Sequence, residues 1–277
     1  MAGSNRLRDH STAGLICDVD GVLVNSPHER TWGETLAMLF ETNEAWRRIR
    51  AQTSWDPAAY TQEVYLSVAA GKPRRDGARD LLEYFGVPDE NEARLDELYQ
   101  AKQEVFLTLV DRGEFEVFDD GVRFVLEARA RGYRQAAASS SKNATRLLEM
   151  VKLAPFCAKY SLHYEFAGPE TRLADMFEAD VCGHPFPHGK PAPDIFLGAA
   201  AALDIPPTDC IVFEDAVSGV QAAKAGAMLC VGVARLDDEK MLEQAGADAV
   251  VSSLEQLTFE QLESLYRRAA TSRNGTH

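Results

Sequence analysis

Short apolar runs alternate with amphipathic segments along the second half of the chain. The apolar runs predict strands over 133–138, 178–182, 210–213, 227–232 and 248–251. The amphipathic segments predict helices over 121–131, 142–152, 192–203, 216–225, 238–245 and 255–269. Such alternation is typical of a parallel sheet with helices packed on its faces.

The chain between residues 28 and 117 has a different pattern. Its apolar residues recur at three- and four-residue spacing, which predicts helices over Thr31–Phe40, Ala58–Ala69, Arg75–Phe85 and Asn91–Val110. The apolar run 14–18 comes before this block and predicts one more strand of the sheet. We therefore expect an α/β fold, with a doubly wound parallel-sheet core and an inserted all-helical cap domain.

The domain boundaries follow from this pattern. We expect the core to comprise residues 13–26 and 118–269, and the cap residues 27–117. The two junctions would lie side by side and act as a hinge. The polar ends, 1–12 and 270–277, are predicted to be flexible.

The composition is that of a globular protein with a sizeable core: 277 residues, 45% of them hydrophobic and 26% charged. No apolar stretch approaches the roughly 20 residues that span a bilayer, and the amino end lacks the apolar core of a signal peptide. The five cysteines are odd in number and widely spaced, which favours reduced thiols over disulfides. We therefore expect a cytoplasmic protein without a membrane partner.

The net charge of −14 argues against nucleic acid as a partner, because phosphate backbones are bound by clustered Lys and Arg. It does not exclude a small anionic substrate. Salt screens surface charge beyond about 8 Å, so a few cations inside a cleft can outweigh an acidic exterior. The number of subunits stays open between a monomer and a small homo-oligomer.

An acid pair ends the first predicted strand. Asp18 and Asp20 stand two positions apart, followed by Gly21. Alternate residues of a strand share a face, and open α/β sheets bind ligands at the carboxyl ends of their strands. Two adjacent carboxylates repel each other unless a cation or a proton lies between them. The pair thus indicates a site, with a simple turn cap as the alternative.

Later strand ends carry matching polar groups. Ser139-Ser140-Ser141-Lys142-Asn143 combines hydroxyls with a helix start and could bind an anion, although one serine could simply cap the helix. Lys190 stands between Gly189 and Pro191, with a solvated surface lysine as the alternative. Glu214-Asp215 repeats the acid pair after another strand. Four carboxylates are therefore expected at one sheet edge.

The ordered set of an Asp pair, a hydroxyl, a Lys and a second acid pair resembles the haloacid dehalogenase superfamily of phosphotransferases. Three segments are similar to its β-phosphoglucomutase branch: His28-Glu-Arg30-Thr-Trp32, Gly71-Lys-Pro-Arg74 and Ser139-Ser-Ser141-Lys142-Asn143. The resemblance implies phosphoryl transfer on a small phosphorylated metabolite, a phosphosugar in that branch. A phosphatase that hydrolyses a sugar phosphate is the alternative.

The resemblance also implies roles for the strand-end residues. Asp18 would be the nucleophile that forms an aspartyl-phosphate, and Asp20 the general acid and base. Ser139 would hold the transferring phosphoryl group, and Lys190 would neutralise its charge together with Mg²⁺.

The implied Mg²⁺ site is built from oxygen ligands, which this ion prefers. Asp18, the backbone carbonyl of Asp20 and Asp215 would supply them. Glu214 would lie close by or bind through water.

A mutase must also hold the part of its substrate that does not react. The resemblance implies that Arg74 from the cap does this when the cap closes. Ser140, Ser141, Lys142 and Asn143 would be its partners from the core. His28 and Lys102 are further candidates from the cap, each with a structural role as the alternative. The segment between Gly21 and His28 is shorter than in that branch, which leaves open whether His28 reaches Asp20.

Two features depart from the branch. Asp120 stands where a Pro is usual at the second hinge, and we interpret it as a cap of the next helix. Residues 158–172 are an extra stretch that we expect at the sheet edge opposite the site, in a structural or subunit-contact role.

Other classes of protein remain possible. A receiver-like signalling module uses a similar acid pair but needs no cap of this length, and a binding protein without catalysis is a further alternative. Asp20 disfavours a hydrolytic dehalogenase. Because P-loop and Gly-x-Gly-x-x-Gly signatures are absent, nucleotide-driven chemistry has little support.

Overall fold

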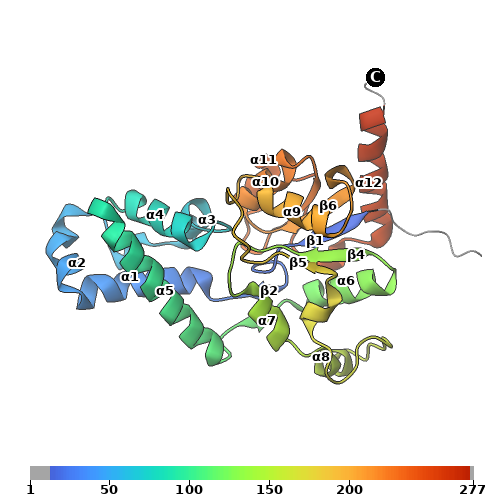
Figure 1. The fold of residues 1–277 in the computed structure, drawn as a ribbon, viewed down its shortest axis with the longest axis horizontal. Coiled ribbons are helices and arrows are strands. Elements are labelled where there is room, and N and C mark those ends of the chain that lie inside the picture. Colours follow the sequence, from blue (N-terminus) through green and yellow to red (C-terminus); the bar gives the residue numbers. More distant parts are fainter. Residues whose placement is uncertain (1–12, 275–277) are drawn as a thin grey trace, which may run out of the picture.

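The fold is built on one six-stranded parallel sheet, in a computed structural model that describes residues 13–274. The strand order is β5-β4-β1-β6-β7-β8, so β1 lies at the centre, between β4 and β6 (Figure 1). The strands are β1 (Gly14–Cys17), β4 (Arg134–Ala137), β5 (Ala179–Asp180), β6 (Cys210–Glu214), β7 (Leu229–Val233) and β8 (Ala249–Val251).

Helices cover both faces of this sheet, as a doubly wound fold requires. Alternate residues of β1 pack into apolar clusters on opposite faces of the sheet. Leu15 and Cys17 belong to one cluster, and Ile16 belongs to the other. The core helices are α6 (Asp119–Ala130), α7 (Ala144–Met150), α8 (Leu153–Lys159), α9 (Asp194–Ala202), α10 (Val217–Ala225), α11 (Glu239–Gln244) and α12 (Phe259–Asn274). The predicted fold class is confirmed.

The all-helical cap lies between β2 and β3 in the chain and forms the left part of the molecule in Figure 1. It has its own apolar cluster, centred on Trp46, Phe40 and Phe85. Its helices are α1 (His28–Thr42), α2 (Glu44–Ile49), α3 (Gln62–Val68), α4 (Arg74–Tyr84) and α5 (Ala93–Asp111).

The two junctions between cap and core pair with each other. β2 (Val24–Asn25) and β3 (Glu116–Val117) form a short antiparallel ribbon. The sequence analysis missed both strands because two residues carry no periodicity. The two junctions therefore lie side by side, as expected for a hinge. The domain boundaries at 27 and 117 stay a prediction.

The helix predictions needed four corrections, of which the first is α2, a helix that was not predicted. Residues 58–69 are not one helix, because Tyr60 is extended and separates a 3₁₀ turn from α3. Helix α8 was not predicted, and α12 continues to Asn274 instead of ending near residue 269. The predicted flexibility of 1–12 and of 275–277 lies outside the described residues.

The extra stretch 158–172 also differs from its prediction. The stretch was predicted to lie at the sheet edge opposite the site, and this was wrong for Tyr160. Its hydroxyl hydrogen-bonds Asp119 at the start of α6, next to the hinge. The physical reason is α8, which turns the chain back after α7. Tyr164 then hydrogen-bonds Glu127 farther along α6, so the stretch packs along that helix.

The five cysteines are all free thiols, as the sequence analysis predicted. Among the described residues, none of the helices combines the length and the apolar character that a bilayer crossing requires.

Candidate active site

The turn after β1 brings the first acid pair against the second. The Asp18 side chain is buried at the carboxyl end of β1, and its backbone N–H donates to the Phe213 carbonyl at 2.9 Å. Gly21 has φ +84°, and a Cβ on it would lie 1.7 Å from Asp215 Oδ2. Only glycine therefore allows the turn to pack directly on that carboxylate.

Lys190 lies between the acid pairs and is almost fully buried. Its Nζ donates to Asp18 Oδ1 at 2.8 Å and to Glu214 Oε1 at 2.5 Å. Burial lowers the pKa of Lys190, but the two carboxylates more than offset this effect and hold its pKa above the ordinary value. Burial raises the pKa of Asp18 to about 8, although Lys190 opposes the shift. One ammonium thus leaves the acids incompletely neutralised.

The uncompensated negative charge of these carboxylates is suited to binding a cation. Asp18, Glu214 and Asp215 each offer a carboxylate oxygen, and these oxygens all lie within 4.8 Å of one another. Burial and repulsion by Glu214 and Asp18 raise the pKa of Asp215 well above its ordinary value. A buried cluster of hard oxygen donors with too little positive charge is suited to a divalent metal. These residues therefore fit the expected ion.

The carboxylate of Asp20 is not part of this cluster and has its own partners. Ser26 Oγ and Ser139 Oγ both donate to it, the latter at 3.2 Å. His28 Nε2 lies 3.5 Å from Asp20 Oδ1, so the shortened connection does not prevent His28 from reaching it. Burial raises the pKa of Asp20, but His28, Ser26 and Lys102 more than offset this and lower it to about 2.

Two cap residues continue this arrangement. Lys102 Nζ lies 2.7 Å from His28 Nδ1, and the His28 ring stacks on Phe106 at 4.4 Å between centroids. Burial lowers the pKa of Lys102 well below its ordinary value, and Arg74 adds to the effect. His28 and Lys102 therefore connect α1 and α5 of the cap to the acid pair of the core.

The expected substrate residues divide into two groups. Among the described residues, no carboxylate lies within ion-pair distance of Arg74, which is half-buried over the Tyr99 ring at 5.0 Å. Lys142 is exposed, and Ser141 Oγ accepts from the Asn143 N–H at 3.3 Å. The cations thus remain available to an anion.

The other group holds the cap on the core. Ser140 Oγ donates to the Gly71 carbonyl at 3.2 Å, and Ser218 Oγ donates to the Ala70 carbonyl at 3.1 Å. The side-chain amides of Asn143 and Gln103 exchange two hydrogen bonds of 3.2 Å. The sequence analysis missed Ser26, Ser218 and Gln103, because a single hydroxyl or amide on a helix or turn carries no motif.

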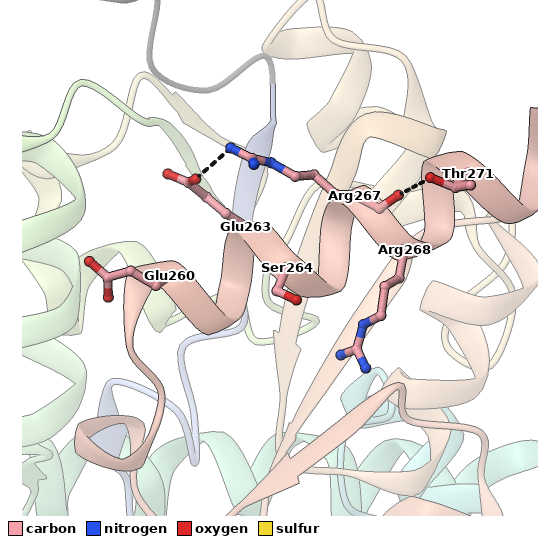
Figure 2. Close-up of a pocket in the computed structure, with 6 residues that line it drawn as sticks. All are labelled: Glu260, Glu263, Ser264, Arg267, Arg268 and Thr271. Carbon is pink, nitrogen blue, oxygen red and sulfur yellow. Dashed lines mark hydrogen bonds and ion pairs between the residues drawn. The ribbon is translucent and has the colours of Figure 1, made fainter.

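A hollow along one face of α12 is separate from this site. Figure 2 shows its lining side chains, all from that one helix. They are Glu260, Glu263, Ser264, Arg267, Arg268 and Thr271. None of the strand-end residues lines it.

The comparison with protein families agrees with this geometry. Residues 12–226 match the haloacid dehalogenase-like hydrolases. The chain belongs to this family. It is therefore an enzyme of the haloacid dehalogenase superfamily, and its relatives support the β-phosphoglucomutase-like branch.

Two curated relatives of this haloacid dehalogenase-like chain have different activities in their names. A β-phosphoglucomutase of Mycobacterium tuberculosis is 31% identical over 254 residues, which cover 87% of this chain and 89% of that protein. A phosphorylated carbohydrates phosphatase of Thermotoga maritima is 30% identical over 240 residues, which cover 86% and 93%. The solved structure of an archaeal β-phosphoglucomutase from Pyrococcus sp. aligns with a TM-score of 0.63 and 28% identity, covering 91% and 97%.

Proposed function

We propose that this enzyme transfers a phosphoryl group on a small phosphosugar through an aspartyl-phosphate at Asp18, with Mg²⁺ as its cofactor. The observation that carries the proposal is the position of Asp18. Its carboxylate contacts Lys190 and forms an acid cluster with Glu214 and Asp215, and the cap hydrogen-bonds to the loops around it. The partner is then a small phosphorylated metabolite.

The chain's own groups support an in-line attack by Asp18. A carboxylate and a phosphate repel each other, and the Lys190 ammonium at 2.8 Å reduces this repulsion. Mg²⁺, held by Asp18, Asp215 and Glu214, would neutralise further charge on the transferring phosphoryl group. The Ser139 hydroxyl would hold an oxygen of that group.

Asp20 suits the role of general acid and base. It lies two residues after Asp18 but has separate hydrogen-bond partners, so it can exchange a proton with an oxygen of the substrate. His28 and Lys102 lie beside it and lower its pKa, so that Asp20 is ionised before substrate binds and can accept a proton. Closure of the cap excludes water from the aspartyl-phosphate.

Arg74 and Lys142 favour a mutase over a simple phosphatase. A mutase must hold a second anionic group away from the reacting phosphate, and Arg74 with Lys142 would supply this clamp. A phosphatase is the second candidate function, since one relative that aligns over most of its length is named a phosphorylated carbohydrates phosphatase.

A substrate screen separates the two functions. Phosphorylated sugars are incubated with Mg²⁺, with and without a sugar bisphosphate, and both inorganic phosphate and isomerised sugar are measured. Isomerisation that depends on the bisphosphate supports the mutase. Release of inorganic phosphate from many substrates, with no isomer formed, would replace it by the phosphatase.

Replacing Arg74 by Ala should affect phosphosugars selectively. A hydrogen bond to a charged group is worth about 1.5–3 kcal/mol, so we expect kcat/KM for the best phosphosugar to fall about 10- to 100-fold. Turnover of p-nitrophenyl phosphate, which has no second anionic group, should change little. The control is Arg79→Ala on the same helix, where the guanidinium is exposed and already paired with Asp76. Equal losses on both substrates would argue against a clamp at Arg74.

A further inference from the structure

Arg235, just after β7, lies beneath the turn that follows β1. Its Nε donates to the Gly21 carbonyl at 3.0 Å, and one terminal nitrogen donates to the Val22 carbonyl at 3.1 Å. Both terminal nitrogens also donate to Asp120, at 2.8 and 3.1 Å, and the guanidinium stacks over the Phe118 ring at 4.0 Å. A single side chain therefore contacts the turn and both sides of the hinge.

The interpretation of Asp120 as a helix cap was wrong, because Asp120 lies inside the first turn of α6 and no side chain of the described residues caps the start of that helix. Besides Arg235, Asp120 accepts hydrogen bonds from Ser253 Oγ at 2.9 Å and from the Leu254 N–H at 2.7 Å. The paired side chains of Arg235 and Asp120 are only 11% and 10% exposed. The bidentate pair thus joins the start of α6 to the loops after β7 and β8, which the sequence interpretation of Asp120 did not anticipate.

The carbonyls of Gly21 and Val22 need such a donor. Val22 is fully buried, and a buried carbonyl without a partner is costly. Gly121 packs so closely that a Cβ on it would lie 2.5 Å from the Val22 carbonyl oxygen, so water has little room there. Lysine could not replace this guanidinium, because its single ammonium lacks the planar fork that serves several acceptors at once.

The same turn determines where the acids lie. It begins at Asp20, and Gly21 rests directly on the Asp215 carboxylate. A shift of the turn therefore moves Asp20 and the surface against which Asp215 is held. Groups that orient metal ligands without touching the metal commonly change affinity or activity about 10- to 100-fold when they are removed.

We propose that Arg235, fixed by its ion pair with Asp120, is a positioning residue that holds the Gly21–Val22 turn and thereby the metal-binding acids. The inference rests on the proposed function, both for its metal site and for its link to turnover, and metal binding and turnover are measured separately.

The test uses Mn²⁺ binding, followed by electron paramagnetic resonance, and turnover of p-nitrophenyl phosphate across a range of Mg²⁺ concentrations. In Arg235→Gln we expect Mn²⁺ to bind about 10- to 100-fold more weakly, with a matching rise in the Mg²⁺ needed for half-maximal rate. Arg235→Lys should recover only part of the affinity. Asp120→Asn should act in the same direction, and the double variant Asp120→Asn, Arg235→Gln should be less affected than the sum of the two.

The matched control is Lys224→Gln. The ion pair of Lys224 with Asp248 lies at the amino end of β8, whereas the acid cluster lies at the carboxyl ends of the strands. This variant should lose some thermal stability and keep its Mn²⁺ affinity. If folded Arg235→Gln bound Mn²⁺ as tightly as the wild type, the positioning role would be refuted. If the wild type bound Mn²⁺ but turned over no phosphate ester, the proposed function would fail while the positioning role could still be measured.

Discussion

Replacing Asp18 by Asn should abolish turnover of every phosphate ester. The amide is a far weaker nucleophile than the carboxylate, and losses of a covalent nucleophile usually exceed about a thousandfold. The measurement is steady-state release of p-nitrophenol, together with intact-protein mass after incubation with substrate. We expect neither turnover nor a phosphorylated protein. Activity close to that of the wild type would remove the basis of the proposed mechanism.

The same substitution should not weaken the metal-free fold at neutral pH. Burial raises the pKa of Asp18 from 3.8 to about 8 in the folded protein. A carboxyl whose folded pKa is raised contributes stability below its unfolded pKa, and this is lost as pH rises toward the folded pKa. In EDTA the wild type should therefore lose stability between about pH 4 and pH 8, and Asp18→Asn should lose less.

Asp96→Asn is the control for both measurements, because Asp96 is an exposed carboxylate on α5 paired with Arg75. It should keep turnover and the pH profile of stability of the wild type. A steeper loss of stability with pH in Asp18→Asn than in the wild type would contradict the raised pKa.

The acid cluster was predictable as far as the sheet edge at which its residues lie. Apolar runs that alternate with helices form a parallel sheet, and all carboxyl ends of a parallel sheet meet at one edge. Asp18, Lys190 and Glu214 were therefore expected at one edge of the sheet. Asp18 meets Glu214 there because β1 and β6 are neighbouring strands, and this pairing is not readable from the spacing of the acids.

The contacts between cap and core could not be predicted in the same way. Gln103 and Asn143 meet only because the cap closes at one particular angle, and closure depends on tertiary packing. Asp120 shows the same limit: its local pattern favours a helix cap, whereas its main partner, Arg235, lies 115 residues away. Long-range partners of single polar residues have no signature in one sequence.

Charge balance explains why replacing a carboxylate of the site and replacing its lysine should have opposite effects on the stability of the metal-free protein. The cluster of Asp18, Glu214 and Asp215 is served by one buried ammonium, that of Lys190. Removing an acid reduces the surplus of negative charge. Removing the lysine increases it, in a place where water cannot screen the charges.

Lys190→Met should therefore destabilise the metal-free protein strongly and abolish turnover. Breaking a buried pair by removing one partner costs about 3–5 kcal/mol, because the remaining charge is left unpaired. The measurement is urea unfolding in EDTA and again in excess Mg²⁺. Mg²⁺ should restore part of the lost stability, since the cation replaces the missing positive charge among the same carboxylates. Turnover should not return, because Lys190 also reduces the repulsion between Asp18 and the substrate.

The comparison variant is Lys224→Met, whose ion pair with Asp248 is partly exposed. Pairs of this kind contribute about 1 kcal/mol or less, so its loss should be small and the same with and without Mg²⁺. A loss in Lys190→Met that equals this small value in EDTA would mean that the acids are neutralised by bound protons alone. The buried lysine would then contribute to the chemistry of the site but not to the stability of the fold.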